Sequence, residues 1–162
     1  MTTDIGEELP ETEEAPAPRD VGWHAAEARQ LHAAQLVLDR LDHINVRLAE
    51  LSALAKELQP KAEGAILLEF YPCGPGCLGC PHHRWIRWVV DRRHEPPRWM
   101  GVRIGDPSKM LKRSGRFEEC YPHMLELVRE AKKLLARRAK LITSLSRAAA
   151  AARAPVEQPE QD

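Results

Sequence analysis

Apolar residues recur with helical spacing in two long stretches of the chain, which flank a middle segment of different period. In the first stretch, from about residue 23 to 59, these residues follow one another at alternating intervals of three and four. They are Ala34, Val37, Leu41, Ile44, Leu48, Leu51, Ala55 and Leu58. This is the a/d repeat of a heptad, which predicts a long helix with coiled-coil packing. Pro60 follows and is expected to end the helix.

The second stretch, from about residue 117 to 153, repeats the same spacing with one charged residue in it. Its positions are Met124, Leu127, Ala131, Leu134, Arg138, Leu141, Leu145 and Ala148. A charge at such a position sets register or pairs with an acid across the interface, and we expect one of these roles for Arg138. A neighbouring stripe of Val128, Leu135 and Ile142 widens the apolar face, which favours a bundle over a lone helix pair. We therefore predict a helical hairpin that dimerises.

The middle segment contains three short runs rich in β-forming residues, at 65–71, 85–90 and 98–104. The second run alternates bulky and basic residues, and a turn at 91–97 separates it from the third. These runs predict an antiparallel hairpin or three-stranded sheet, followed by a basic connection at 108–116. A sheet of this size is marginal by itself, so we expect a metal ion and helix packing to hold it.

Three of the four cysteines lie close together between the first two runs. Cys73, Cys77 and Cys80 are separated by three and by two residues, and glycines and prolines fill the gaps. Thiolates at such spacings, followed by imidazole, are the ligands that tetrahedral zinc prefers. No carboxylate is placed as a general base beside them, so the predicted zinc is structural and not catalytic.

The fourth ligand is open between three alternatives. His83 follows Cys80 after two residues and can fold back in a tight turn, so it is favoured. His82, after one residue, would point away in an extended backbone. Cys120 or His123, near the start of the second helix, would tie that helix to the cysteine loop.

Together these patterns predict an α+β protein, mainly α, in which two long antiparallel coiled-coil helices flank a small zinc-stapled sheet. Only eight of the 162 residues are aromatic, which argues against a large globular core. Residues 21–153 are expected to form one helix–zinc-knuckle–helix domain. Residues 1–20 are expected to be a disordered acidic tail, because their composition cannot bury enough apolar surface, and 154–162 a second disordered tail.

Charge is distributed unevenly although the formal net charge is zero. Residues 1–20 hold seven acids and one base, whereas residues 84–116 hold ten bases and three acids. Arginines suit phosphate oxygens, and the interleaved Trp85, Trp88 and Trp99 can stack on bases or pack in the core. We therefore predict nucleic-acid binding, with DNA favoured, through the hairpin and its continuation. The predicted contact residues are Arg84, Arg87, Arg92, Arg93, Arg98, Arg103, Lys109, Lys112 and Arg113.

The run from about residue 63 to 153 resembles a poorly characterised prokaryotic family found among mobile-element and plasmid genes. The resemblance rests on Cys-Gly-Pro-Gly-Cys-Leu-Gly-Cys-Pro-His, the aromatic strand after it, the basic hairpin and the long helix. It implies a cysteine knuckle, a strand pair and flanking helices. The family has no established activity, so the resemblance adds a genetic setting and no mechanism.

Two other functions remain open from the sequence. One is an oligomeric adaptor in which the zinc knuckle only shapes a protein-binding tip. The other is a thiol oxidoreductase using Cys77 and Cys80, although such thiols are normally activated at a helix N-terminus and a strand is expected here. The chain shows no paired carboxylates, nucleophile constellation or phosphate loop, so we expect neither an enzyme nor a small-molecule substrate. With no signal peptide or membrane span in sight, we expect a cytoplasmic protein.

Overall fold

The computed structural model describes residues 20–153, and the chain falls into two compact units, 1–37 and 38–162. In the first unit the described residues are helical and form the beginning of α1 (Asp20–Leu58). Apart from Asp20, the first residue of α1, the tails predicted at 1–20 and 154–162 lie outside the described residues.

The second unit contains the rest of α1, a three-stranded antiparallel sheet and the remaining helices. The strands are β1 (Ile66–Tyr71), β2 (His82–Asp91) and β3 (Arg98–Ile104), and their order in the sheet is β1-β2-β3. After the sheet come α2 (Pro107–Met110), a 3-10 turn η1 (Gly115–Phe117) and α3 (Tyr121–Arg153). The α+β class and the antiparallel sheet are confirmed. No helix within the described residues is both long and apolar enough to cross a membrane.

Two local signals explain where the chain between β3 and α3 departs from the prediction. The Asp106 side chain accepts a hydrogen bond from the Ser108 amide and Pro107 follows it, which together start the short helix α2. Gly115 has a φ of 63°, so the backbone turns there before α3 can begin. The second long helix consequently begins at Tyr121 and not near residue 117.

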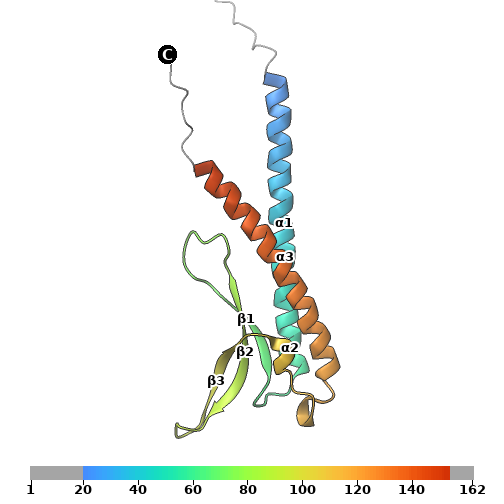
Figure 1. Ribbon diagram of the computed structural model, residues 1–162, viewed down its shortest axis with the longest axis vertical. Helices are drawn as coiled ribbons and strands as arrows, with labels where there is room; N and C mark the ends of the chain where they lie inside the picture. Colours follow the sequence, from blue (N-terminus) through green and yellow to red (C-terminus); the bar gives the residue numbers. More distant parts are fainter. Residues whose placement is uncertain (1–19, 154–162) are drawn as a thin grey trace, which may run out of the picture. The chain divides into compact units, whose positions relative to one another are not determined.

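The core of the second unit lies where α1, α3 and the sheet meet. The two helices run in opposite directions beside each other (Figure 1), and the heptad residues Ile44, Leu48, Leu51 and Ala55 are buried. They belong to one cluster with residues of α3 and the sheet; these include Met124, Leu127, Val128, Ala131, Leu135, Ile66, Leu68, Trp85 and Ile86. The sheet thus accounts for the wide apolar face of the helices. Ala34, Leu58 and Ala148 are exposed, and coiled-coil packing along the whole heptad pattern stays a prediction.

Two buried polar side chains, Ser52 of α1 and Gln59 directly after it, pair with the outer edge of β1. The Gln59 side chain accepts a hydrogen bond from the Ile66 amide (2.8 Å) and donates one to the Ile66 carbonyl (2.6 Å). Ser52 donates to the Leu68 carbonyl at 2.6 Å. A sheet edge presents unpaired amides and carbonyls that must find partners when buried, and the helix supplies them here. These contacts fix β1 against α1, and therefore fix the start of the loop that carries the cysteines.

Candidate metal centre and basic hairpin

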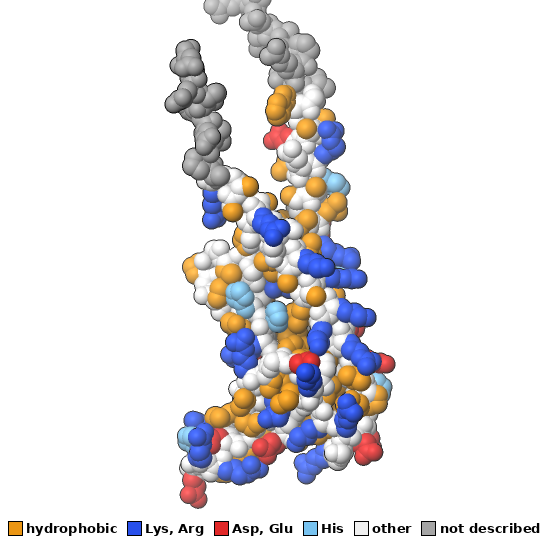
Figure 2. All heavy atoms as spheres, viewed as in Figure 1, with side chains coloured by type: hydrophobic (Ala, Val, Ile, Leu, Met, Phe, Trp, Pro, Cys, Tyr) orange, Lys and Arg blue, Asp and Glu red, His pale blue; other side chains and the backbone are white. Residues whose placement is uncertain are grey.

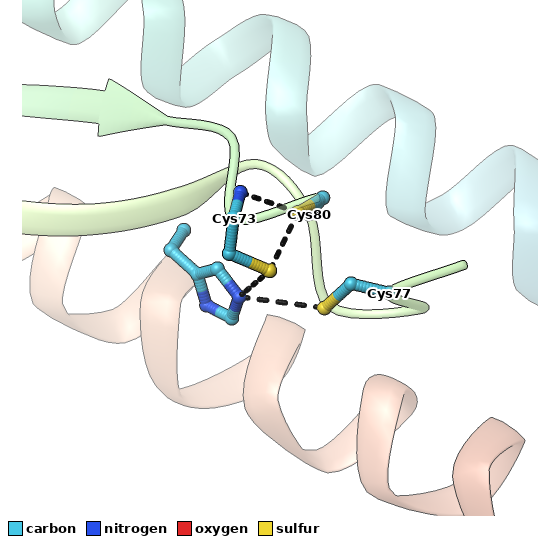
Figure 3. Close-up of side chains that lie close together, drawn as sticks. Cys73, Cys77 and Cys80 are labelled. Carbon is cyan, nitrogen blue, oxygen red and sulfur yellow. Dashed lines mark hydrogen bonds between the residues drawn. The ribbon is translucent and has the colours of Figure 1, made fainter. Parts of the chain in front are cut away.

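The loop at 72–81, which joins β1 to β2, brings three thiols and one imidazole together (Figure 3). The Cys73 sulfur lies 3.3 Å from that of Cys80, and the His82 Nε2 atom lies 3.1 Å from Cys73 Sγ and 3.4 Å from Cys77 Sγ. All four candidate ligand atoms lie within 4.8 Å of one another. Tetrahedral zinc, with Zn–S bonds of about 2.3 Å, holds its sulfurs about 3.8 Å apart. The cluster therefore has the size of a metal site.

Local backbone geometry gathers these side chains. Gly74 and Gly76 have φ values of 144° and 80°, which residues with a Cβ rarely adopt, so the loop can reverse twice within a few residues. The Cys73 amide donates to the Cys80 sulfur at 3.3 Å, and the Cys80 amide donates to the Cys77 carbonyl at 3.3 Å. Amides that point at sulfur in this way are suited to a thiolate ligand.

The histidine in the cluster is His82, the alternative, and not the favoured His83. The tight turn expected to bring His83 back to the cysteines does not form, because β2 already begins at His82. His82 pairs with Tyr71 at the end of the β1–β2 pairing. Neighbouring residues of a strand point to opposite faces, so His82 and His83 diverge. The His83 pKa is lowered, first by burial and then by the nearby charges of Arg138 and His82.

The long-range alternatives for the fourth ligand also lie elsewhere. Cys120 is buried just before α3, where its thiol donates to the Phe117 carbonyl at 3.4 Å. Burial raises the pKa of this thiol. His123 is exposed on α3. Neither belongs to the group of residues that can hold a metal ion.

Hydrogen bonds within the cluster shift the pKa values of two of its thiols in opposite directions. Bonds with the Cys80 and Cys77 sulfurs raise the pKa of Cys73 to about 12. The pKa of Cys80 is lowered, mainly because the Cys73 amide donates to it. Cys80 is followed by Pro81 and then by β2, so the Cys77–Cys80 pair lacks the helix N-terminus that activates thiols in oxidoreductases of the Cys-x-x-Cys type.

Arg138 of α3 is the residue that joins the cysteine loop to both helices. Its guanidinium donates to the carbonyls of Gly79 (3.0 Å) and Pro81 (2.9 Å), on either side of Cys80, and to Asn45 Oδ1 of α1 (2.7 Å). The sequence pattern singled out Arg138 as a charge on the apolar seam but suggested register or an acidic partner. The contact of Arg138 with the cysteine loop was not predicted, because no sequence pattern indicates which backbone carbonyls a distant arginine will reach.

The register of the sheet divides the predicted nucleic-acid contacts between two faces. Arg84 lies on the same face as Ile86, which pairs with Arg103, whereas Arg87 shares the other face with Asp91, which pairs with Arg98. A flat ligand on one face cannot reach all four. Three arginines of the set also have acidic partners, namely Arg84 with Glu69, Arg92 with Glu63 and Arg93 with Asp91.

The other basic residues of the set differ in their surroundings. Within residues 20–153 no acid pairs with Arg87, Arg98, Arg103 or Lys109. Lys112 donates to the Glu63 carbonyl, and the Arg113 guanidinium lies 5.3 Å from the centre of the Tyr121 ring. On the face visible in Figure 2, acidic side chains are interspersed among the basic ones. The unpaired cations therefore form a smaller set than the sequence suggested.

The three tryptophans of the hairpin have different positions. Trp85 belongs to the core and is 7% exposed, whereas Trp99 is 52% exposed. Trp88 and Trp99 line an apolar groove of about 410 Å³ between the end of α1 and the sheet. Ala55, Gln59, Ala62 and Leu67 are among its other lining residues, and Lys56 and Lys61 supply its cations.

Comparison of the chain with protein-family models, with curated proteins and with solved structures gives no match in any of the three. The resemblance to a mobile-element family therefore stays a prediction.

Proposed function

We propose that this is a non-enzymatic zinc-binding protein in which the metal is structural and closes the loop between β1 and β2. The observation that carries the proposal is the group formed by Cys73, Cys77, Cys80 and His82, whose ligand atoms lie within 4.8 Å of one another. Three thiolates and one imidazole suit zinc, and four protein ligands complete its tetrahedral shell. No position is then left open for a substrate or an activated water.

Metal content of protein purified without chelator tests this proposal. We expect one zinc per chain, lost in Cys77→Ser and retained in Cys120→Ser, which removes the one cysteine outside the cluster. The adjacent histidines offer a second matched pair: His82→Gln should lower zinc affinity strongly, whereas His83→Gln should not. Metal-free wild-type protein with an easily oxidised Cys77–Cys80 pair would refute the zinc site and favour a thiol oxidoreductase.

We further propose that the protein binds nucleic acid, DNA in the first place, as an accessory protein of a mobile element or plasmid. The support is the set of cations without acidic partners, Arg87, Arg98, Arg103 and Lys109, together with Trp99, which is exposed beside Lys56 and Lys61. Guanidinium groups contact phosphates, and an exposed indole can stack on an unpaired base. All four cysteines are free thiols, as expected of a protein in the reducing cytoplasm.

Titration of labelled DNA across salt concentrations tests the nucleic-acid proposal. Affinity should fall steeply with salt, and each lost phosphate contact should reduce the slope of log K against log salt by about one. Arg87→Gln combined with Arg98→Gln, which removes two arginines from one face of the sheet, should therefore weaken binding and flatten the slope. Arg84→Gln, which removes an arginine already paired with Glu69, serves as the control and should have a smaller effect. Unchanged binding in the double variant would contradict the assignment.

A protein-binding adaptor is the second candidate, and the groove beside Trp88 favours it. The groove is lined mostly by apolar side chains, which suit an apolar segment of another protein better than a phosphate backbone. On this hypothesis Trp99→Ala abolishes partner binding at all salt concentrations. Dimerisation through the helices is proposed alongside either function, because α1 exposes Leu31, Leu36 and Leu38. Sedimentation of wild type and of Leu31→Glu checks the dimer.

A further inference from the structure

Arg138 is a buried cation for which the described residues provide no carboxylate. The residue is 5% exposed, and its three hydrogen bonds go to neutral acceptors: Asn45 Oδ1 and the carbonyls of Gly79 and Pro81. A charge removed from water without an opposite charge is costly, and proteins normally pair it. The surroundings of Arg138 therefore call for a source of negative charge close by.

The cysteine cluster can provide that charge. Both carbonyls that Arg138 contacts belong to residues adjacent to Cys80, one before it and one after it. A divalent metal bound by three thiolates and a neutral imidazole carries a net charge of about −1. Burial lowers the pKa of Arg138, and the charges of Cys80 and Cys77 act in the opposite direction. One buried cation thus lies beside a centre that becomes anionic when metal binds.

We propose that Arg138 is a positioning residue that couples zinc binding to the packing of α3 against α1. It fixes the backbone on both sides of Cys80, balances the charge of the loaded site, and joins both to α1 through Asn45. Because coupling between two sites is reciprocal, zinc strengthens the helix contact as much as the helix contact strengthens zinc binding. The inference rests on the proposed zinc site and assigns it a second role, that of holding the helical hairpin in place.

Zinc affinity, measured by competition with a chromophoric chelator, tests the coupling. Contacts behind the ligands of a metal site typically contribute 10–100-fold in affinity. We expect Arg138→Gln to lose about tenfold or more and Arg138→Lys, which keeps the charge but not the forked geometry, to lose less. Arg47→Gln is the matched control. It breaks another contact between α1 and α3, the Arg47–Glu130 ion pair at 2.8 Å, without touching the cysteine loop, and should leave zinc affinity unchanged.

A double-mutant cycle separates coupling from a purely structural role. The loss of stability caused by Arg138→Gln should be larger in the zinc-bound protein than in the Cys77→Ser background, which lacks the site. Equal losses in the two backgrounds, with unchanged zinc affinity, would overturn the inference while leaving the zinc site intact. Wild-type protein without zinc would overturn both. If Arg138→Gln does not fold, Asn45→Ala takes its place, since it removes the link to α1 and keeps the buried cation.

Discussion

At the scale of single residues, three of the four buried polar side chains of the described residues, Ser52, Gln59 and Arg138, connect segments that are separate in the chain, and the fourth, Asp91, holds the turn after β2. Ser52, Gln59, Asp91 and Arg138 are the buried polar residues among those described. No buried side-chain nitrogen or oxygen of the described residues lacks a hydrogen-bond partner. Because a buried polar group without a partner costs about 1–3 kcal/mol, these four positions should tolerate substitution poorly.

Asp91 predicts one pH dependence of stability. The hydrogen bond from the Arg93 side chain is the main cause that holds the carboxyl pKa of Asp91 below its ordinary value of 3.8, and the hydrogen bond from the Arg93 amide is the second. A lowered pKa stabilises the folded state above about pH 4, and this contribution disappears as the pH falls through the folded value. Asp91→Asn should therefore be less stable than wild type at pH 7, and the difference should shrink below pH 4.

Denaturant unfolding at pH 7, 4 and 3 measures this difference. Asp42→Asn, on an exposed position of α1, is the control and should run parallel to wild type. Asp91 is at the far end of β2 from His82, so any release of the proposed zinc at low pH should affect both proteins alike. A stability gap that does not change with pH would argue against a role for the Asp91 charge.

Gly64 predicts a backbone effect. It is buried between α1 and β1 with a φ of 106°, a conformation that residues with a side chain rarely adopt. An added Cβ would also overlap Cε of Lys112, whose side chain would have to move. Gly64→Ala should lower the free energy of unfolding by about 1–3 kcal/mol. Thermal unfolding measures this loss. Gly105→Ala is the control and should have little effect, because an added Cβ there meets no atom within 4 Å.

At the scale of secondary-structure elements, the sheet depends on α1 at one edge and on the cysteine loop at one end. Gln59 acts towards β1 much as a further strand would, since it both donates to and accepts from Ile66. The Gln59 side chain also donates to the Ala55 carbonyl in the last turn of α1, at 2.9 Å, which holds it in place. This side chain, together with Ser52, consequently helps to set the position of β1 and of the loop after it.

Substitution of this side chain should therefore weaken the whole edge. Gln59→Ala leaves the buried Ile66 amide and carbonyl without partners, so we expect a loss of about 2 kcal/mol or more in the free energy of unfolding. Hydrogen exchange should locate the effect, with the Ile66 amide losing protection first. Glu57→Ala, two residues earlier and exposed, is the matched control. Retained protection at Ile66 in Gln59→Ala would show that water or another group replaces the amide.

Much of this element structure could be predicted from periodicity. The third strand has the predicted bounds, and α1 ends one residue before the expected Gln59. Heptad residues such as Leu48 are buried as their spacing indicates. Local periodicity succeeded because alternate burial in strands and three-to-four spacing in helices are imposed by backbone geometry itself.

Features set by contacts between distant segments could not be predicted in this way. The choice of His82 over His83 depends on where the ladder with Tyr71 ends, which spacing alone does not fix. The partners of Arg138 come from positions more than 50 residues away. The pairing of Arg84 and Arg92 with acids on other segments likewise reduced a basic surface that residue counts had suggested.

At the scale of the second unit as a whole, the proposed zinc site lies where the cysteine loop meets Arg138 of α3, which also contacts Asn45 of α1. Removal of zinc should therefore destabilise more than the loop. A metal bound only by the folded state adds about 2.7 kcal/mol when its concentration is 100 times the dissociation constant. We expect chelator to lower the midpoint of thermal unfolding, and exchange at 72–84 to rise before exchange at the buried core around Ile86. Unchanged melting with the zinc removed would contradict a structural role.

The four proposed metal ligands lie close together along the chain. The outermost of the proposed ligands, Cys73 and His82, are only nine positions apart. A loop of this length closes within about 10–100 ns, so an unfolded or newly synthesised chain can capture the ion before its helices have met. The ion would then serve as a template for the β1–β2 hairpin during biosynthesis. Affinity of the unfolded chain for zinc would reduce the gain in equilibrium stability without removing it, and zinc would in addition affect the speed and order of folding.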